Sequence, residues 1–255
     1  MTFPATRSSF VRDLTSADPA ARAAAYEALA RSYWRPVYVY VRLRWHKSPE
    51  DAQDLTQAFF ARVFERAYFE NYDPSKARFR TFVRTCLDRF LSNEAQASSR
   101  QKRGSDLTIA GVDFARFDAD LARHARSDEP DPEQWFYREW IRGLFADAIE
   151  RLRTECHASG HRAAFTLFER YDIDHGDTGS GTTYAALARE MGLSVTAVTN
   201  ELAWARRAFR AIVLEHLRGV CATDDEFRAE ARDLLGIDGA TERKASRGAA
   251  KLPVT

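Results

Sequence analysis

The chain has 255 residues, 45% of them hydrophobic and 12% aromatic, and carries a formal net charge of +1. This composition excludes a chain that is disordered throughout, and the length allows one large domain or two small ones. No stretch reaches the ~18 uninterrupted apolar residues of a membrane span, and no secretory run begins the chain. With only three scattered cysteines, we expect a cytoplasmic protein that contacts no membrane.

Caps and prolines predict helices in the N-terminal part of the chain. Asp18-Pro19 and Ser48-Pro49 each place a capping side chain before a proline at the first helical position. The expected helices cover residues 19–45, with a bend or restart at Pro36, then 49–68 and 79–98, with a turn at 71–74.

The helix expected at 49–68 has two different faces. Placed at 100° steps, Ala52, Phe59 and Val63 fall on a packed side, together with Thr56. A separate stripe is acidic or polar and contains Glu50, Asp51, Asp54 and Gln57. This stripe is either a solvated helix face or a docking face for a basic partner protein. A phosphorylation site at Thr56 is disfavoured because that residue lies on the packed side.

Basic and aromatic residues alternate around the start of the helix at 79–98. Residues 76–103 hold eight basic and two acidic residues, whereas 105–155 hold twelve acidic and seven basic ones. Cations can meet phosphates while aromatic faces stack on unpaired bases, each stack contributing about 1–3 kcal/mol. The alternative is that the aromatic residues form the core stripe of an amphipathic helix. The candidate residues for nucleic acid are Asn71, Tyr72, Lys76, Arg78, Phe79, Arg80, Arg84 and Asn93.

The C-terminal half contains a second set of helices after an acidic linker without clear periodicity. The expected helices cover residues 132–156, 161–171, 184–191, 194–218 and 224–235, with a loop at 172–182. Thr183 and Ser194 are capping residues, and Gly192 between them supplies a left-handed stop. Two helices joined by a tight glycine turn predict a helix-turn-helix.

The second helix of this pair has an outward face that suits the major groove of DNA. Small polar groups at its beginning can reach base edges, and arginines further along can reach phosphate or guanine. The outward candidates include Thr196, Thr199, Asn200, Arg206 and Arg207. An ordinary helical hairpin is the alternative.

No catalytic or metal-binding pattern is expected. Cys156, His157 and His161 could share a metal, but Gly160 interrupts their helix and no second pair of ligands exists. No nucleophile elbow, phosphate-binding loop or paired-histidine helix occurs. We therefore predict a protein that is not an enzyme and that needs no cofactor and no metal.

Together these elements predict an all-α fold with two helical domains joined by a long linker. The predicted division is 1–104 for the first helical domain, 105–132 for the acidic linker, 133–218 for the helix-turn-helix domain, and 219–255 for an extension with a short helix and a disordered tail.

The order of these elements resembles the extracytoplasmic-function sigma factors, two-domain members of the sigma-70 family. The resemblance covers residues 17–103 and 133–218. The first block is its more specific part, and it contains the stretch Glu50-Asp51-Ala52-Gln53-Asp54-Leu55-Thr56-Gln57. It implies that residues 1–104 correspond to sigma region 2 and 133–218 to region 4. The implied partners are promoter DNA and the β′ and β subunits of the RNA polymerase core, with an anti-sigma factor or a kinase as a further candidate.

The resemblance also implies roles for the candidate residues. Asp51, Asp54 and Gln57 match the motif that docks on the β′ clamp helices, and residues 71–80 match the segment that holds an extruded base of the minus-ten element. Arg84 and Asn93 lie on the helix expected at 79–98, which begins within this segment. In the helix-turn-helix, the DNA-facing positions of the surface that reads the minus-thirty-five element match Ser194, Thr196, Thr199, Asn200 and Arg206.

Three other interpretations remain open at this stage. A stand-alone helix-turn-helix regulator would bind duplex DNA without polymerase. The others are an enzyme of nucleic-acid metabolism and a pure interaction module. Within the sigma-factor interpretation, we also consider that the acidic linker competes with DNA for the basic helix through Asp113, Asp118 and Asp120.

Overall fold

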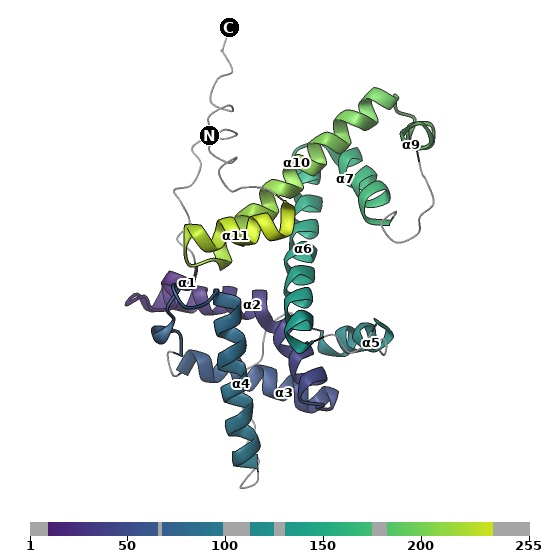
Figure 1. Ribbon diagram of the computed structural model, residues 1–255. Helices are drawn as coiled ribbons and strands as arrows, with labels where there is room; N and C mark the ends of the chain where they lie inside the picture. Colours follow the sequence, from purple (N-terminus) through teal and green to yellow (C-terminus); the bar gives the residue numbers. More distant parts are fainter. Residues whose placement is uncertain (1–9, 66–67, 99–112, 125–130, 175–182, 237–255) are drawn as a thin grey trace. The chain divides into compact units, whose positions relative to one another are not determined.

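The computed structural model describes residues 10–65, 68–98, 113–124, 131–174 and 183–236 (Figure 1). Every regular element that these residues form is a helix, which confirms the all-α class. The chain divides into two compact units. Unit 1 comprises the residues up to Gly143 together with those from Leu217 onward, and unit 2 comprises Leu144–His216. The extension predicted to follow the last domain thus belongs to unit 1.

Unit 1 is built around the long helix α2. Its elements are α1 (Phe10–Asp13), α2 (Pro19–Arg44), α3 (Pro49–Glu65), the 3-10 turn η1 (Tyr68–Asn71), α4 (Phe79–Ser98), α5 (Phe114–His124), the first part of α6 (Pro132–Ala158), and α11 (Asp224–Leu235). The expected helices at 19–45, 79–98 and 224–235 are confirmed within one residue. Helix α3 ends at Glu65, earlier than expected.

The sequence of α2 explains both its start and its burial. The Asp18 side chain accepts a hydrogen bond from the Ala20 N–H at 3.0 Å, and proline follows at the first helical position. Pro36 lies inside the helix, which continues past it to Arg44. A proline there costs about 3 kcal/mol. Residues 36–41 are all buried, so packing around this turn outweighs that cost.

The expected linker contains a helix that the sequence analysis missed. In α5, Phe114 and Leu121 are buried, and the Phe114 ring centroid lies 5.3 Å from that of Tyr38 in α2. Asp118 accepts hydrogen bonds from Arg42 Nε at 2.7 Å and from Tyr38 Oη at 2.9 Å. Asp118 therefore contacts α2 rather than the basic helix α4. The hypothesis that this residue competes with DNA for α4 is corrected.

The hypothesis named two further acids, Asp113 and Asp120. Asp113 accepts a hydrogen bond from the Arg116 N–H at 3.0 Å, as an N-cap does, and the side chain of Asp120 lies outside the described residues. The signal for α5 in the sequence is weak. The apolar positions 114, 117 and 121 follow helical spacing, but the stretch is short and charged residues surround it, so a linker was expected there.

Unit 2 contains the rest of α6, α7 (Arg162–Phe168), the π-helical turn η2 (Glu169–Ile173), α9 (Tyr184–Met191) and most of α10 (Val195–Val220). The α9–α10 pair has the predicted caps. Thr183 Oγ1 accepts from the Ala186 N–H at 3.2 Å, and Ser194 Oγ accepts from the Ala197 N–H at 3.0 Å. Gly192 between them has φ +65°, the predicted left-handed stop.

A small apolar core holds this pair in place. Its buried residues are Leu167, Leu187, Ala188, Val198 and Leu202. The loop expected at 172–182 is replaced at its beginning by η2, and residues 175–182 lie outside the described residues, as does the tail expected to be disordered.

The contact between α5 and α2 makes a testable contribution to stability. Burial raises the pKa of the Asp118 carboxyl, but the hydrogen bonds from Arg42 and Tyr38 outweigh burial and leave the pKa below its ordinary value. We expect Asp118→Asn to lower the free energy of unfolding by about 1–3 kcal/mol near neutral pH. Urea unfolding of the full chain measures this difference.

The pH dependence of that difference has a definite sign. Because the folded pKa of Asp118 lies below the unfolded one, its carboxylate stabilises the fold above the unfolded pKa. This contribution is lost as the pH falls through the folded pKa, so the two proteins should converge on acidification. Asp113→Asn is the matched control, because asparagine caps a helix as well as aspartate does. Equal losses for both variants would contradict the assignment.

A second prediction concerns the turn between α9 and α10. Ala at position 192 must adopt a positive φ, so we expect Gly192→Ala to destabilise the chain by about 1 kcal/mol. Gly219 has no positive φ, lies inside α10 and has open space where a Cβ would stand. Gly219→Ala should therefore raise the melting temperature while Gly192→Ala lowers it. Shifts of the same sign in thermal unfolding would refute the turn geometry.

Candidate nucleic-acid interface

The acidic face of α3 is open to solvent. Asp51 and Asp54 are exposed and Gln57 is half-exposed. Among the described residues, neither aspartate forms an ion pair with a cationic side chain. Ser48 Oγ accepts a hydrogen bond from the Asp51 N–H at 3.1 Å and so fixes the start of the helix. The uncompensated carboxylates suit a basic partner surface.

The opposite face of α3 packs into unit 1, as its helical period predicts. Ala52 and Thr56 have no exposed surface, and Phe59 is 1% exposed. The Thr56 hydroxyl has no hydrogen-bond partner among the described residues. Its burial agrees with the interpretation that disfavoured phosphorylation at this position.

An exposed aromatic ring near the acidic face was not predicted from the sequence. Phe64 is 50% exposed and lies on the Gln57 side of α3, seven residues later. Its ring meets Tyr26 edge-on, with 5.0 Å between ring centroids. Large exposed aromatic side chains are enriched at protein interfaces, so Phe64 extends the candidate docking face.

The turn before α4 is held by its own side chains. Asp73 Oδ1 accepts hydrogen bonds from the Ser75 hydroxyl at 2.6 Å and from the Ser75 N–H at 3.0 Å. These bonds, with the Lys76 ammonium, lower the pKa of Asp73 to about 2. Asn71 and Lys76 are exposed, and Tyr72 donates a hydrogen bond to the Ala77 carbonyl at 3.0 Å.

Phe79 is part of the core, which corrects its assignment as a base-stacking residue. Its side chain has no exposed surface, and its ring meets those of Tyr33, Phe69 and Tyr72 at 5.9, 5.4 and 5.2 Å. The ring is therefore unavailable for stacking in this structure. The physical reason is the helical period of α4, which turns position 79 inward together with Val83 and Phe90.

Arg78 and Arg80 lie on the surface beside Phe79, and both are engaged by α11. Arg78 Nη1 is 2.8 Å from Asp233 Oδ2 and 3.2 Å from Glu230 Oε1, and Arg80 pairs with the other Glu230 oxygen. The Arg78 side chain is 35% exposed and that of Arg80 is 18% exposed, whereas both were expected on the outer face. Their acidic partners in α11 were not predicted from the sequence.

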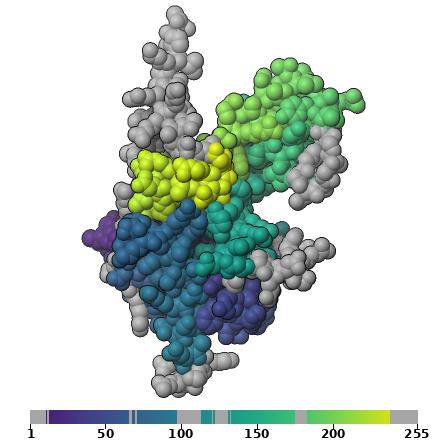
Figure 2. All heavy atoms as spheres, in the orientation of Figure 1, coloured from purple at the N-terminus to yellow at the C-terminus, as the bar shows by residue number. Residues whose placement is uncertain are grey.

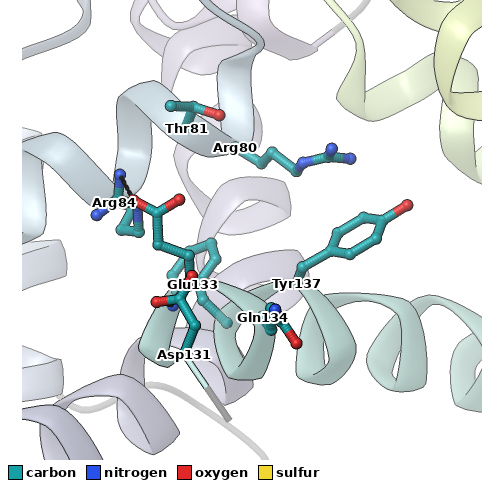
Figure 3. A pocket seen from close by; sticks show the side chains of 8 residues that line it. Arg80, Thr81, Arg84, Asp131, Glu133, Gln134 and Tyr137 are labelled. Carbon is teal, nitrogen blue, oxygen red and sulfur yellow. Dashed lines mark hydrogen bonds and ion pairs between the residues drawn. The ribbon is translucent and has the colours of Figure 1, made fainter.

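A small pocket lies next to Arg80 and Arg84 (Figure 3). The start of α4 and the start of α6 line it with Arg80, Thr81, Arg84, Asp131, Glu133, Gln134, Phe136 and Tyr137. Arg84 Nη2 is 2.5 Å from Glu133 Oε1, and the Arg80 guanidinium lies 4.1 Å from the centroid of the Tyr137 ring. Tyr137 is an aromatic neighbour of the cations that the sequence analysis missed. Asn93 is exposed further along α4.

In unit 2, the beginning of α10 presents the predicted polar groups. Ser194, Thr196, Thr199 and Asn200 are exposed. The Ser194 and Thr199 hydroxyls are engaged locally, the first as the helix cap and the second as a donor to the Val195 carbonyl at 2.9 Å.

Arg206 and Arg207 are adjacent in α10 but differ in their contacts. Arg206 Nη2 is 2.8 Å from Asp172 Oδ1, and its Nη1 donates to Tyr184 Oη at 3.2 Å. The hydrogen bonds with Asp172 raise the Arg206 pKa above its ordinary value. Arg207 is exposed and makes no ion pair with any described residue of the chain. Arg207 is thus the freer of the two cations.

Two of the three residues considered for a metal, Cys156 and His161, are used in packing, and His157 is exposed. Cys156 is buried, and the His161 ring stacks on Trp204 with its Nδ1 3.0 Å from Glu201 Oε2. Within the described ranges, no group of three His, Cys, Asp or Glu side chains is arranged to hold a metal ion. None of the helices in those ranges combines the length and apolarity that crossing a bilayer requires.

Comparison with protein families gives one match. Residues 29–101 match the family model described as Sigma-70 region 2. No curated protein and no solved structure gave a match. Unit 1 therefore contains a sigma-70 region 2 domain, and its match covers α3, the turn at residues 72–78 and α4. The match supports a sigma factor of the sigma-70 family.

Proposed function

We propose that the chain is a sigma factor of the extracytoplasmic-function type, which confers promoter recognition on bacterial RNA polymerase. The observation that carries this proposal is the region 2 match over residues 29–101. That segment holds both an exposed acidic helix face and the basic start of α4, the two surfaces that a sigma factor needs for polymerase and for the minus-ten element.

Docking on polymerase is assigned to α3. Asp51, Asp54 and Gln57 would meet the β′ clamp helices, with Phe64 at the edge of the contact. Exposed carboxylates without internal partners have no intramolecular ion pairs to lose on binding, so a basic partner gains the full interaction. Their helix is anchored by the buried face that carries Ala52 and Phe59.

Recognition of the minus-ten element is assigned to the surface at the start of α4. Arg78, Arg80, Arg84 and Lys76 supply positive charge for the phosphates of the melted strand. Taking a base out of the duplex costs a few kcal/mol, which contacts to the extruded base and to its flanking phosphates must offset. Tyr72 and Tyr137 are two nearby aromatic residues that are partly exposed.

Recognition of the minus-thirty-five element is assigned to α10 in unit 2. The N-terminal residues Thr196, Thr199 and Asn200 would reach base edges in the major groove, and Arg207 would reach phosphate or guanine. Arg206 would first have to leave Asp172, so we assign it a secondary role in DNA contact and a primary role in holding η2 near α10.

Reversing the acidic face tests the docking assignment. We expect Asp51→Lys with Asp54→Lys to weaken binding to the polymerase core at least about 100-fold, because two attractive contacts become repulsive. Co-elution and fluorescence anisotropy with purified core measure the affinity, and circular dichroism checks the fold. Glu27→Lys with Glu150→Lys is the control, since both glutamates are exposed and lie outside α3. Normal core binding by the α3 variant would reject the assignment.

Truncating the exposed groups of α10 tests the duplex contact. We expect Asn200→Ala with Arg207→Ala to weaken binding of the reconstituted holoenzyme to promoter duplex by about 10- to 100-fold, while core binding stays unchanged. Titration with a labelled duplex at several salt concentrations measures this, and the salt slope should fall by about one.

Arg162→Ala supplies the control, because Arg162 is exposed in the same unit but lies on α7. If duplex affinity fell equally for Arg162→Ala, the loss would reflect net charge rather than groove contact. If the chain bound palindromic duplex as tightly without polymerase, the stand-alone regulator would be the better interpretation.

A further inference from the structure

Helix α11 covers the start of α4 with carboxylates. Glu230 contacts both arginines, Asp233 contacts Arg78, and Glu226 accepts a hydrogen bond from the Phe79 N–H at 2.6 Å. We call the group formed by Arg78, Arg80 and the Phe79 N–H the α4 anion site. Figure 2 shows the surface of α11 (yellow) lying against the blue surface that includes α4. Three acids from one helix thus occupy all three donors of this site.

The acidic face of α11 follows from its sequence. Positions 226, 230 and 233 are spaced by four and three residues, so their side chains share one face of the helix. On the neighbouring face Phe227 is 1% exposed and Ala231 is fully buried. The apolar residues fasten α11 to unit 1, and the acids are thereby aimed at the α4 anion site.

The burial of Glu230 shows that this docking depends on the arginines. Its side chain is 2% exposed, and a buried carboxylate is unfavourable unless cations and hydrogen-bond donors compensate it. Burial raises the pKa of the Glu230 carboxyl, and Arg80 and Arg78 oppose that rise. Without the two guanidinium groups, a neutral apolar residue would fit this position better.

The same donors are those that a nucleic-acid phosphate uses. Guanidinium groups and backbone N–H groups at the first turn of a helix are standard phosphate ligands. Each donor of the α4 anion site already points at a carboxylate oxygen, so phosphate and α11 cannot both be bound there. The α11 carboxylates stand where phosphate oxygens would stand.

We propose that α11 is an intramolecular ligand that competes with single-stranded nucleic acid for the α4 anion site. The short connection at residues 221–223 joins α11 to α10. Such a tether gives an effective concentration in the mM range. The free chain therefore binds single strands weakly, and α11 must leave before the strand engages Arg78 and Arg80. This inference rests on the proposed contact between α4 and the minus-ten strand.

Neutralising the acids that face the site tests the competition. The variant Glu230→Gln with Asp233→Asn keeps the side-chain shapes, and Asp224→Asn with Asp225→Asn is the control with the same change of net charge in the same helix. The side chains of Asp224 and Asp225 are 72% and 93% exposed, and among the described residues they pair with Arg218 and Arg228 rather than with α4. The probe is a fluorescein-labelled single-stranded DNA of mixed sequence, titrated into each full-length protein without polymerase.

The expected result is a specific gain of affinity. When α11 is docked on the α4 anion site in about 90–99% of the free chains, the apparent affinity for the single-stranded probe is about 10- to 100-fold weaker. We therefore expect the Glu230/Asp233 variant to bind the probe at least roughly tenfold tighter than the native chain and the control. Equal affinity of all three proteins would overturn the proposal.

Hydrogen exchange provides a readout that does not depend on any variant. In the native chain the α11 amides should be protected, and saturating single-stranded DNA should remove this protection. Protection that persists with the strand bound would overturn the competition. Core binding and transcription by the native chain test the proposed function separately: if both are normal while the exchange and affinity results fail, only the competition is rejected.

Discussion

The insertion of Phe79 into the core of unit 1 is the constraint on which the interface depends. Its ring lies among Tyr33, Phe69 and Tyr72 and has no exposed surface. Because neighbouring positions on a helix start point in other directions, burial of this ring fixes Arg78 and Arg80 at the surface. The pattern of alternating basic and aromatic residues is thus divided, with Phe79 in the core and the cations assigned to the proposed binding of phosphates.

The free chain presents its two charged surfaces differently. The carboxylates of α3 are exposed and have no cationic partner among the described residues, whereas the arginines at the start of α4 are already paired with α11. Under the proposals above, the α3 carboxylates are available to a basic partner while the arginines of α4 are still covered by α11. That order agrees with the proposed sigma-factor role.

Local signals in the sequence were sufficient for most helix ends and insufficient for tertiary pairing. The caps at Asp18, Thr183 and Ser194 and the stop at Gly192 are set by neighbouring residues, so the sequence alone locates them. Helix α5 and the docking of α11 depend on partners far along the chain. Asp118 meets Arg42 and Glu230 meets Arg80, and no local pattern encodes either pair. The same limit applies to Arg206, which was an outward candidate for DNA. Its ion-pair partner Asp172 lies far along the chain and could not be found from local pattern.

Run-off transcription with purified core polymerase tests the central claim most directly. The chain is added to core and to a library of genomic promoter fragments, and the same core with a sigma factor of established promoter serves as the positive control. The account predicts discrete transcripts whose start sites share two upstream elements and that disappear when the chain is left out. An active control without any transcript dependent on this chain would contradict it.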